Sequence, residues 1–204
     1  MGIALCMGLF SSCDALEGLY DDPTVEQASN QYYIDCTEYD QWVYVKFHEN
    51  GAPTITTSKI DVTTYEETGA PTDWDIAQHR YDVKTNGAKV YKTDYHSIDE
   101  LVNVGLPAVS QWTEDEYSDK SISIDMSRMM EGIIVYAPGY KNALIGEWVE
   151  VDTSSMPPNY TMHDNVYVVQ LKDGTYLSIQ LANFMSTDKY QVKGWMTVNY
   201  KYPI

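Results

Sequence analysis

Residues 73–87 read DWDIAQHRYDVKTNG, and this stretch decides the fold. Its aromatic and β-branched side chains suit a pleated, half-buried surface: Trp74, Ile76, Tyr81 and Val83. Asn86-Gly87 near its end is a dipeptide typical of tight hairpin turns. We therefore predict one central β-strand that closes in a turn at Asn86-Gly87.

Segments on both sides of this stretch show the same strand pattern. Strands are expected at residues 31–36, 41–47, 121–125, 132–136, 147–151, 165–171 and 175–181. Turns are expected at Asn50-Gly51 and at Lys172-Asp-Gly174, the clearest short hairpin of the chain. The Thr-rich run 54–64 indicates an edge strand or a loop excursion. A long loop, 152–164, is expected to join the strand pair 147–151 and 165–171.

One short helix is expected. Ser97 and Glu100 have the spacing of a capping box, in which a Ser at the N-cap is followed three positions later by an acidic residue. The apolar residues that follow give way to Gly105-Leu-Pro107, which ends the helix. The fold class is therefore all-β, a single domain of mostly antiparallel strands over 31–204 with one short helix.

Length and charge narrow the range of functions. The chain has 204 residues, enough for one well-buried core but not for two full domains. The chain has only 13 Lys and Arg but 30 Asp and Glu. The sequence therefore lacks the basic surface that binding to nucleic acid or to anionic lipid headgroups requires. The chain has eighteen Tyr and five Trp but only three Phe. Aromatic rings with a polar group favour strands that have one solvent-exposed face.

The first thirty residues indicate export. Residues 1–12 are apolar, uncharged and too short to span a bilayer, which takes about 20 helical residues. They match the end of a signal peptide whose basic segment we expect upstream. Leu9-Phe-Ser-Ser-Cys13 resembles a bacterial lipobox, so Cys13 is the expected lipidation site and residues 13–30 a lipidated tether. Cys36 is then left unpaired. We expect it to be a buried apolar residue whose thiol pKa Asp35 and Glu38 raise.

Methionines are concentrated in two expected loops. Met126, Met129 and Met130 fall in one turn, and Met156 and Met162 fall in the long loop. Methionine more commonly fills gaps in a core, and that remains the alternative for each residue. Two loops bearing thioethers could instead close on an iron porphyrin from its two faces, because sulfur is a neutral, soft axial ligand.

Three segments carry a family resemblance: residues 73–87, Gln41–Phe47 and the terminal run 195–203. They resemble the HmuY family, the haem-binding lipoproteins of Gram-negative cell surfaces, and the match extends from about Tyr33 to the C-terminus. The resemblance implies a surface protein of the outer membrane that captures haem, takes it from host haemoproteins or other sources, and delivers it to a TonB-dependent transporter for iron acquisition. Release from the cell is a further expectation.

In this family haem lies between two loops, bound through axial His in the best-known member and through Met in relatives. Residues 148–151 match the strand that leads to one ligand, which places that role on Met156. Residues 128–131 match the second ligand loop, which favours Met129, with Met130 and then Met126 behind it. His163 lies in the same long loop as Met156 and competes with it. Neither ligand position holds a His, a departure from the His-ligated pattern.

Other side chains could border the porphyrin. Arg128 and Lys141 are candidates to pair with the haem propionates, although both could equally be ordinary surface charges. Rings that could border the macrocycle are Tyr136, Tyr140, Trp148 and Tyr160. His79, inside the central stretch, is expected to be structural, and His48 and His96 to be solvated.

A second class of function remains open. In it the protein is a cell-surface glycan- or protein-binding β module, with exposed Tyr and Trp as its contact face and the methionines in its core. An enzyme is not indicated. The sequence has no G-x-S-x-G, H-E-x-x-H, C-x-x-C or Gly-rich phosphate loop, and Asp73 with Asp75 has no partner that would mark a glycosidase pair.

Overall fold

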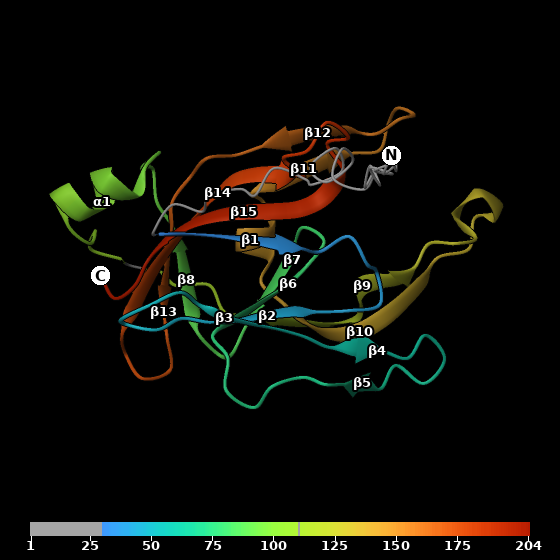
Figure 1. Cartoon of the computed structure of the whole chain (residues 1–204), viewed down its shortest axis with the longest axis horizontal. Coiled ribbons are helices and arrows are strands. Elements are labelled where there is room, and N and C mark those ends of the chain that lie inside the picture. The colour runs from blue at the N-terminus through green and yellow to red at the C-terminus, as the bar shows by residue number, and fades with distance from the viewer. Residues whose placement is uncertain (1–29, 110) are drawn as a thin grey trace, which may run out of the picture.

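The structure, a computed structural model, describes residues 30–109 and 111–204. Its architecture is antiparallel β (Figure 1), which confirms the predicted fold class. A five-stranded sheet has the order β1-β15-β14-β13-β8, and a four-stranded sheet has the order β3-β2-β6-β7. The bounds of the first sheet are β1 Gln31–Asp35, β8 Lys89–Lys92, β13 Tyr167–Gln170, β14 Tyr176–Met185 and β15 Lys193–Lys201. Those of the second are β2 Val43–Lys46, β3 Thr54–Thr57, β6 Ile76–His79 and β7 Asp82–Thr85.

The main core lies between these two sheets. Val43 and Val45 of β2 pack in one cluster with residues of all five strands of the other sheet, such as Ile179 and Val198. Side chains of a strand alternate between its faces, so Tyr44 points to the opposite side of β2 and belongs to a second cluster. The four-stranded sheet therefore buries residues on both faces.

Smaller elements cover the outer faces of the two sheets. A hairpin of β9 Glu116–Asp125 and β10 Val135–Lys141 packs over the four-stranded sheet, where Ile122 and Ala137 meet Tyr44. A short pair, β4 Lys59–Ile60 with β5 Glu67–Thr68, adds to this layer. Helix α1, Ile98–Val104, lies on the outer face of the five-stranded sheet through Leu101.

The stretch 73–87 is a hairpin, so the prediction of one continuous strand is wrong. β6 and β7 pair with each other, with Ile76 opposite Thr85 and His79 opposite Asp82. β6 does lie inside its sheet, between β2 and β7, and all four of its residues are buried. The chain reverses at Arg80 and Tyr81, a dipeptide without the Gly or Asn that marks most such turns.

Tertiary contacts hold this turn. Arg80 has a positive φ of 53°, which few non-glycine residues adopt. Its guanidinium donates to the carbonyl oxygen of Thr37 at 2.8 Å and lies 4.7 Å from the centre of the Tyr39 ring. Gly194 has a positive φ of 103°, which favours glycine, and a Cβ there would come within 2.6 Å of the guanidinium. The turn thus depends on distant parts of the sequence.

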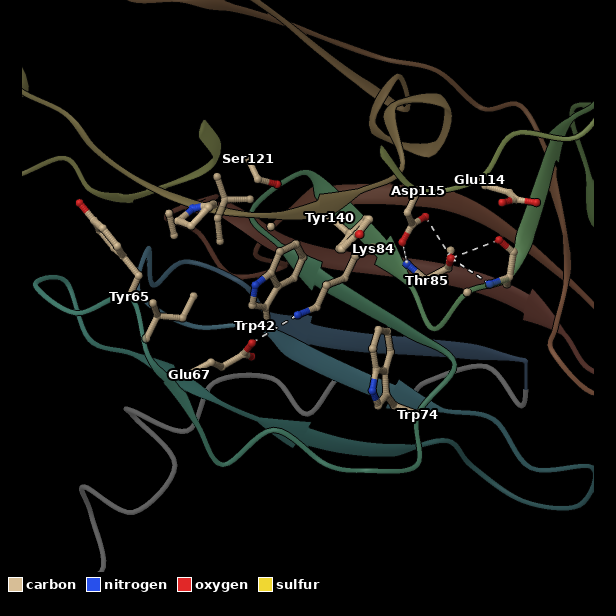
Figure 2. A pocket seen from close by; sticks show the side chains of 17 residues that line it. Trp42, Tyr65, Glu67, Trp74, Lys84, Thr85, Glu114, Asp115, Ser121 and Tyr140 are labelled. Atoms are coloured by element: carbon tan, nitrogen blue, oxygen red, sulfur yellow. Dashed lines mark hydrogen bonds and ion pairs between the residues drawn. The ribbon is translucent and has the colours of Figure 1, made fainter. Parts of the chain in front are cut away.

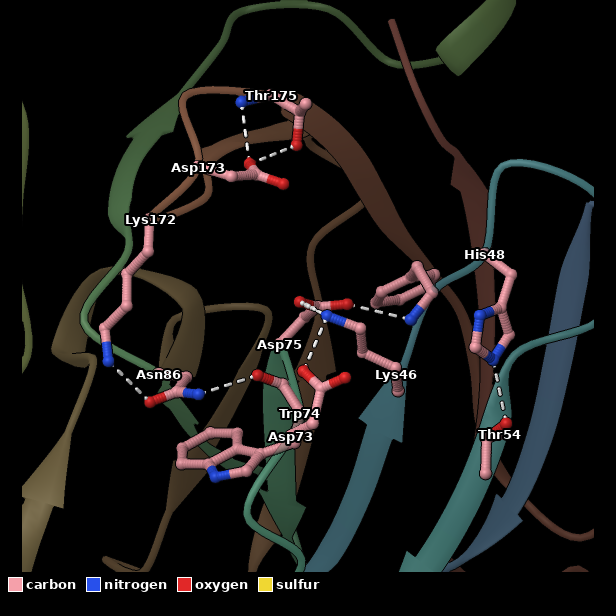
Figure 3. Close-up of polar contacts among 11 residues, drawn as sticks. Lys46, His48, Thr54, Asp73, Trp74, Asp75, Asn86, Lys172, Asp173 and Thr175 are labelled. Carbon is pink, nitrogen blue, oxygen red and sulfur yellow. Dashed lines mark hydrogen bonds and ion pairs between the residues drawn. The ribbon is translucent and has the colours of Figure 1, made fainter.

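Asn86-Gly87 is a corner between the two sheets and not the turn of a hairpin, because β7 and β8 belong to different sheets. Figure 3 shows how the corner is fixed. The Asn86 side chain donates to the carbonyl oxygen of Trp74 at 2.9 Å and accepts from Lys172 at 2.8 Å. The Lys172–Gly174 turn that supplies this lysine joins β13 to β14, so that predicted hairpin is confirmed.

Asp75 fixes the end of β2 close by. Its carboxylate is almost fully buried and accepts from the backbone N–H of Phe47 at 2.8 Å. Lys46 donates to the same carboxylate at 3.0 Å and also pairs with Asp73 at 2.9 Å (Figure 3). The two aspartates therefore share one lysine as part of the scaffold.

The long loop 152–164 is not a plain loop, and its predicted neighbours do not pair. β11 Val149–Asp152 and β12 Asn159–Met162 form their own two-stranded sheet. β13, expected beside β11, instead lies between β14 and β8. The Thr-rich run does form an edge strand, β3, whose residues are mostly exposed.

The predicted helix is confirmed at α1, where the Ser97 hydroxyl accepts from the backbone N–H of Glu100 at 3.1 Å. The Glu100 carboxylate accepts from the N–H of His96 at 3.2 Å, one residue earlier than in the usual box. A one-turn helix, α2 Ala143–Gly146, was not predicted, because four residues give no periodicity to detect.

His96 links α1 to the sheet, and its titration tests that link. The Asp164 carboxylate accepts a hydrogen bond from the His96 imidazole, 2.7 Å away, and this raises the pKa of His96 above its ordinary 6.5. Its stabilising contribution is therefore complete below pH 6.5 and lost as the pH rises through the raised value. We expect Asp164→Asn to lower the pKa of His96, measured by NMR of the imidazole. Asp94→Asn is the control and should lower it less, because Asp94 acts only through space. Equal shifts from the two variants would contradict this role for Asp164.

The predicted signal peptide remnant and the lipidation site Cys13 lie outside the described residues. Within the part of the chain that is described, no helix is long and apolar enough to cross a membrane.

Candidate functional site

The first candidate ligand loop is the tip of the β9–β10 hairpin. A short 3-10 helix, η1 Met129–Glu131, forms it and ends at Gly132 in the left-handed conformation. Backbone hydrogen bonds close the tip, from Met129 N–H to Met126 O at 3.0 Å and from Gly132 N–H to Met129 O at 2.9 Å. The tip is thus a defined turn that holds three methionines.

These methionines are not core residues. Met130 is 87% exposed and Met129 42% exposed, while Met126 is half-buried. A large apolar side chain gains no hydrophobic stabilisation in water, so its exposure calls for another explanation. For this turn, the structure disagrees with the alternative of gap-filling methionines.

The second candidate loop is the tip of the β11–β12 hairpin. Asp152 and Asn159 are the last paired residues, and Met156 lies in the turn between them, 74% exposed. The Ser155 hydroxyl donates to the carbonyl oxygen of Pro157 and accepts from the Asn159 amide, both at 3.1 Å. These bonds order the turn around an exposed thioether.

Both tips project from the same end of the molecule. Figure 1 has the longest axis horizontal, and the η1 turn and the β11–β12 turn both lie at its right-hand end, away from α1. Each hairpin is a separate two-stranded sheet, outside the two large sheets. The scaffold therefore carries two projecting arms with methionine at both tips.

His163 and Met156 occupy different ends of their hairpin. His163 follows β12, and its N–H donates to the carbonyl oxygen of Trp148 at the base of the hairpin. Trp148 and Asp152 are four positions apart along the strand, so the base lies about 13 Å from the start of the turn. The imidazole of His163 is 3.7 Å from the Glu150 carboxylate.

The candidate propionate partners already have carboxylate partners. Arg128 donates twice to Glu131 within the same turn, at 2.6 and 3.1 Å. Lys141 pairs with Asp82 at 3.0 Å. Either cation would have to exchange its carboxylate for a propionate. Both pairs are solvent-exposed or half-exposed, where such ion pairs contribute only about 0–1 kcal/mol.

The candidate aromatic residues divide into two groups. Trp148 is fully buried and its indole N–H donates to the carbonyl oxygen of Tyr81 at 2.8 Å, so it cannot border a macrocycle. Tyr136 and Tyr140 are exposed on β10. Tyr160 is half-buried and stacks on Phe184, with Lys193 over its ring.

The other predicted structural residues lie as expected. His79 is buried, and its Nε2 is 2.7 Å from the carbonyl oxygen of Tyr39. Cys36 is a buried free thiol whose pKa is raised by burial first and by Asp35 second, while the predicted contribution of Glu38 is not found. His48 is exposed and bonds to Thr54 (Figure 3).

One further site was not predicted: a cavity of about 540 Å³ between the four-stranded sheet and the base of the β9–β10 hairpin. Lys84 lies in it, near the rings of Trp42 and Trp74 (Figure 2), and its ammonium is also 4.8 Å from the centre of the Tyr44 ring. Alternation places Trp42, the residue before β2, on the same face as Tyr44 of β2, which is a sequence signal. Trp74 and Lys84 join them only once the β6–β7 hairpin has formed.

The structure defines a class of β protein in which an antiparallel scaffold carries a pair of projecting hairpins. Here each hairpin has an exposed methionine at its tip. The model of the family described as HmuY protein matches residues 38–200. The chain belongs to the HmuY family, as the sequence predicted.

Solved structures agree with this assignment. One from Bacteroides vulgatus, described as an HmuY-like haem-binding protein, is 41% identical, with 85% of this chain and 91% of that chain covered and a TM-score of 0.73. One from Bacteroides fragilis, described as a lipoprotein, is 36% identical, with 88% and 93% covered and a TM-score of 0.76. The apo HmuY analog of Tannerella forsythia shares the fold at 23% identity, with 90% and 100% covered and a TM-score of 0.68. No functionally curated protein matches the sequence.

Proposed function

We propose that this protein binds haem between its two hairpin tips, with the sulfurs of Met129 and Met156 as axial ligands to the iron. One observation carries the proposal: both tips lie at the same end of the scaffold and both expose thioethers to solvent. Thioether sulfur is a recognised axial ligand of haem iron. Haem binding is also the property by which the Bacteroides vulgatus relative is described.

Burial supplies part of the driving force. The tips expose Ile133 and Val151 as well as methionine. A porphyrin face held between the hairpins would remove this apolar surface from water, at about 25 cal/mol for each Å² buried. The flexible, polarisable methionine side chain adapts to such a flat surface. The residues present therefore fit the group.

Alternative ligands remain at each tip. Met130, next to Met129 and the more exposed of the two, is the first alternative in the η1 turn, and Met126 is the second. His163 is the alternative to Met156, but its place at the base of the hairpin would draw the iron away from the tip. Arg128, in the η1 turn itself, is proposed to turn from Glu131 to a haem propionate.

The proposed cellular role is based on the resemblance to the HmuY family. We propose an outer-membrane lipoprotein, anchored through Cys13 and displayed on the cell surface or released from it. It would take haem from its surroundings, host haemoproteins included, and pass it to a TonB-dependent transporter for iron acquisition. The lipobox-like sequence before Cys13 and the Bacteroides fragilis relative described as a lipoprotein support the anchor.

Visible spectroscopy tests the proposal directly. Haem added to the protein should shift the Soret band and sharpen the Q bands to a saturable endpoint at one haem per chain. An unchanged haem spectrum would contradict the proposal. A specific signal on a carbohydrate array together with an unchanged spectrum would favour a glycan-binding module in its place.

Reduction should strengthen binding. A thioether donates less well than imidazole to ferric iron and relatively better to ferrous iron, and methionine ligation raises haem potentials. We expect haem titrations to give a lower dissociation constant with dithionite than without it. Each tenfold preference corresponds to a rise of about 59 mV in the midpoint potential. Tighter ferric binding would contradict ligation by two methionines.

A further inference from the structure

The cavity beneath the β9–β10 hairpin is separate from the proposed haem site. Its volume, about 540 Å³, lies within the range of about 300–1,000 Å³ that is typical of small-molecule pockets. Lys84 comes from β7 and Trp42 directly precedes β2. The β4–β5 segment supplies Tyr65 and Glu67, and the base of the hairpin supplies Ser121 (Figure 2). The methionine tips take no part in its walls.

Aromatic rings form much of this wall. Trp42 is buried, Trp74 is half-buried, and Tyr65 and Tyr140 are exposed where the cavity meets solvent. Ile60, Ile122 and Ala137 add small apolar surfaces. Such walls pack against a ligand with an apolar face, and the aromatic rings with polar tips also tolerate water at the rim.

Donors with free capacity lie in the same cavity. The Lys84 ammonium has three hydrogens, of which one goes to the Tyr44 hydroxyl at 2.7 Å and one to Glu67 at 3.5 Å. The Ser121 hydroxyl is buried and has no hydrogen-bond partner among the described residues. An unpartnered buried hydroxyl is costly, by about 1–3 kcal/mol, so its position calls for a partner.

The cavity also contains carboxylates that can accept further hydrogen bonds. A carboxylate has about four acceptor positions. Asp115 uses three, for the Thr85 N–H and hydroxyl and the Asn142 amide, at 2.6, 3.0 and 3.1 Å. Glu67 accepts from Tyr44, Ser58 and Lys84. Each carboxylate can thus accept a further hydrogen bond from a ligand.

The charges disfavour an anionic ligand, because an anion would meet the carboxylates of Glu67, Glu114 and Asp115. A cation would meet the ammonium of Lys84, which already lies over the aromatic rings of Trp42, Tyr44 and Trp74. A neutral molecule meets neither penalty. It must offer hydroxyls to the free donors and acceptors and an apolar face to the rings.

We propose that this cavity is a second binding site, for a neutral sugar of one or two rings. The C–H face of such a ring packs on Trp74, Tyr65 or Tyr140, and its hydroxyls bond to Lys84, Ser121, Glu67 and Asp115. The site is spatially separate from the proposed haem site, because it uses no side chain of either tip.

Calorimetric titration of the full chain tests the proposal, with glucose, galactose, mannose, N-acetylglucosamine, cellobiose and lactose as probes. At least one should bind with a dissociation constant in the millimolar range or below and change the fluorescence of Trp42 and Trp74. Benzylamine and glucuronate are the charged comparisons and should bind more weakly. Binding of either charged probe in preference to all six sugars, or no binding of any sugar, would overturn the proposal.

Two variants with matched controls complete the test. Ser121→Ala should weaken the best sugar about two- to tenfold, the equivalent of one hydrogen bond, without lowering thermal stability, since an unpartnered hydroxyl is removed. Ser123→Ala, on the same strand but outside the cavity wall, is its control. Trp74→Ala should abolish binding, and Trp112→Ala, on the outer face of the other sheet, should not. Unchanged affinity in Ser121→Ala would contradict the site even if Trp74→Ala fails to fold.

Haem titration of the same preparations separates this proposal from the previous one. Ser121→Ala should bind haem as the parent protein does. Loss of sugar binding with haem binding retained supports two sites, whereas a sugar that competes with haem for the hairpin tips would refute the separate cavity site.

Discussion

Replacing Met129 and Met156 by alanine in the same chain should abolish the Soret shift at micromolar protein. Even the loss of an outer-shell partner of a metal ligand costs about 10–100-fold in affinity, so the loss of both direct ligands should exceed about a hundredfold. The measurement is a haem titration followed by absorbance, at equal protein concentration for parent and variant.

Measuring the free energy of unfolding shows whether the double variant loses haem because its ligands are gone or because it is unfolded. Met129 and Met156 are exposed, so their truncation should change the free energy of unfolding by no more than about 0.5 kcal/mol. The urea midpoints of parent and double variant should therefore agree. A double variant that folds normally and binds haem as tightly as the parent would refute these two ligands.

Single variants decide between neighbouring candidates. Met162→Ala is the matched control, because Met162 is an exposed methionine on the same hairpin as Met156 but away from its tip. It should bind haem like the parent. Met130→Ala and His163→Ala test the two main alternatives. If either one loses the Soret shift while Met129→Ala or Met156→Ala keeps it, the ligand assignment moves to that residue.

Trp148→Ala should destabilise the fold by about 3–5 kcal/mol, the cost of removing a large aromatic side chain from a packed core. Trp148 is fully buried, and it lies at the base of the β11–β12 hairpin in the main core cluster. Its loss removes packing and the bond from its indole N–H to Tyr81. Urea denaturation followed by far-UV circular dichroism measures the change.

Trp148→Phe provides the comparison. It keeps an aromatic ring in the core but removes the indole donor, which leaves the carbonyl oxygen of Tyr81 without that bond. We expect a smaller loss than for alanine. If both variants unfold at the same urea concentration as the parent, the packing and the hydrogen bond of Trp148 do not stabilise the fold.

Local patterns in the sequence were enough to predict most strands and α1. Runs of β-branched and aromatic side chains identify β2 and β13, and the Ser97 cap identifies the start of α1. These features depend on neighbours within a few residues, so sequence reasoning reaches them. The resemblance to the HmuY family, which the family model confirms over residues 38–200, supported the prediction of an all-β fold.

Features set by distant contacts were missed. The turn at Arg80 depends on Thr37, Tyr39 and Gly194, none of them near in sequence. The partner of β11 was misassigned because a short hairpin with Ser and Pro in its turn looks like an irregular loop. The exposure of Met129 could not be predicted either, since a methionine has the same local pattern in a core as on a tip.

The charged cavity was missed for the same reason. Lys84 alternates with Val83 as a surface lysine of a strand would, and only the covering hairpin makes it half-buried. Burial then lowers the pKa of its ammonium, although Glu67 opposes the shift.

The β9–β10 hairpin is both a wall of the cavity and the arm that carries Met129. If two ligands contact one structural element and the first changes the affinity for the second by some factor, the second changes the affinity for the first by the same factor. A saccharide that shifted the hairpin by a fraction of an ångström would thus change the affinity for haem. Sugar binding would then regulate the uptake of iron.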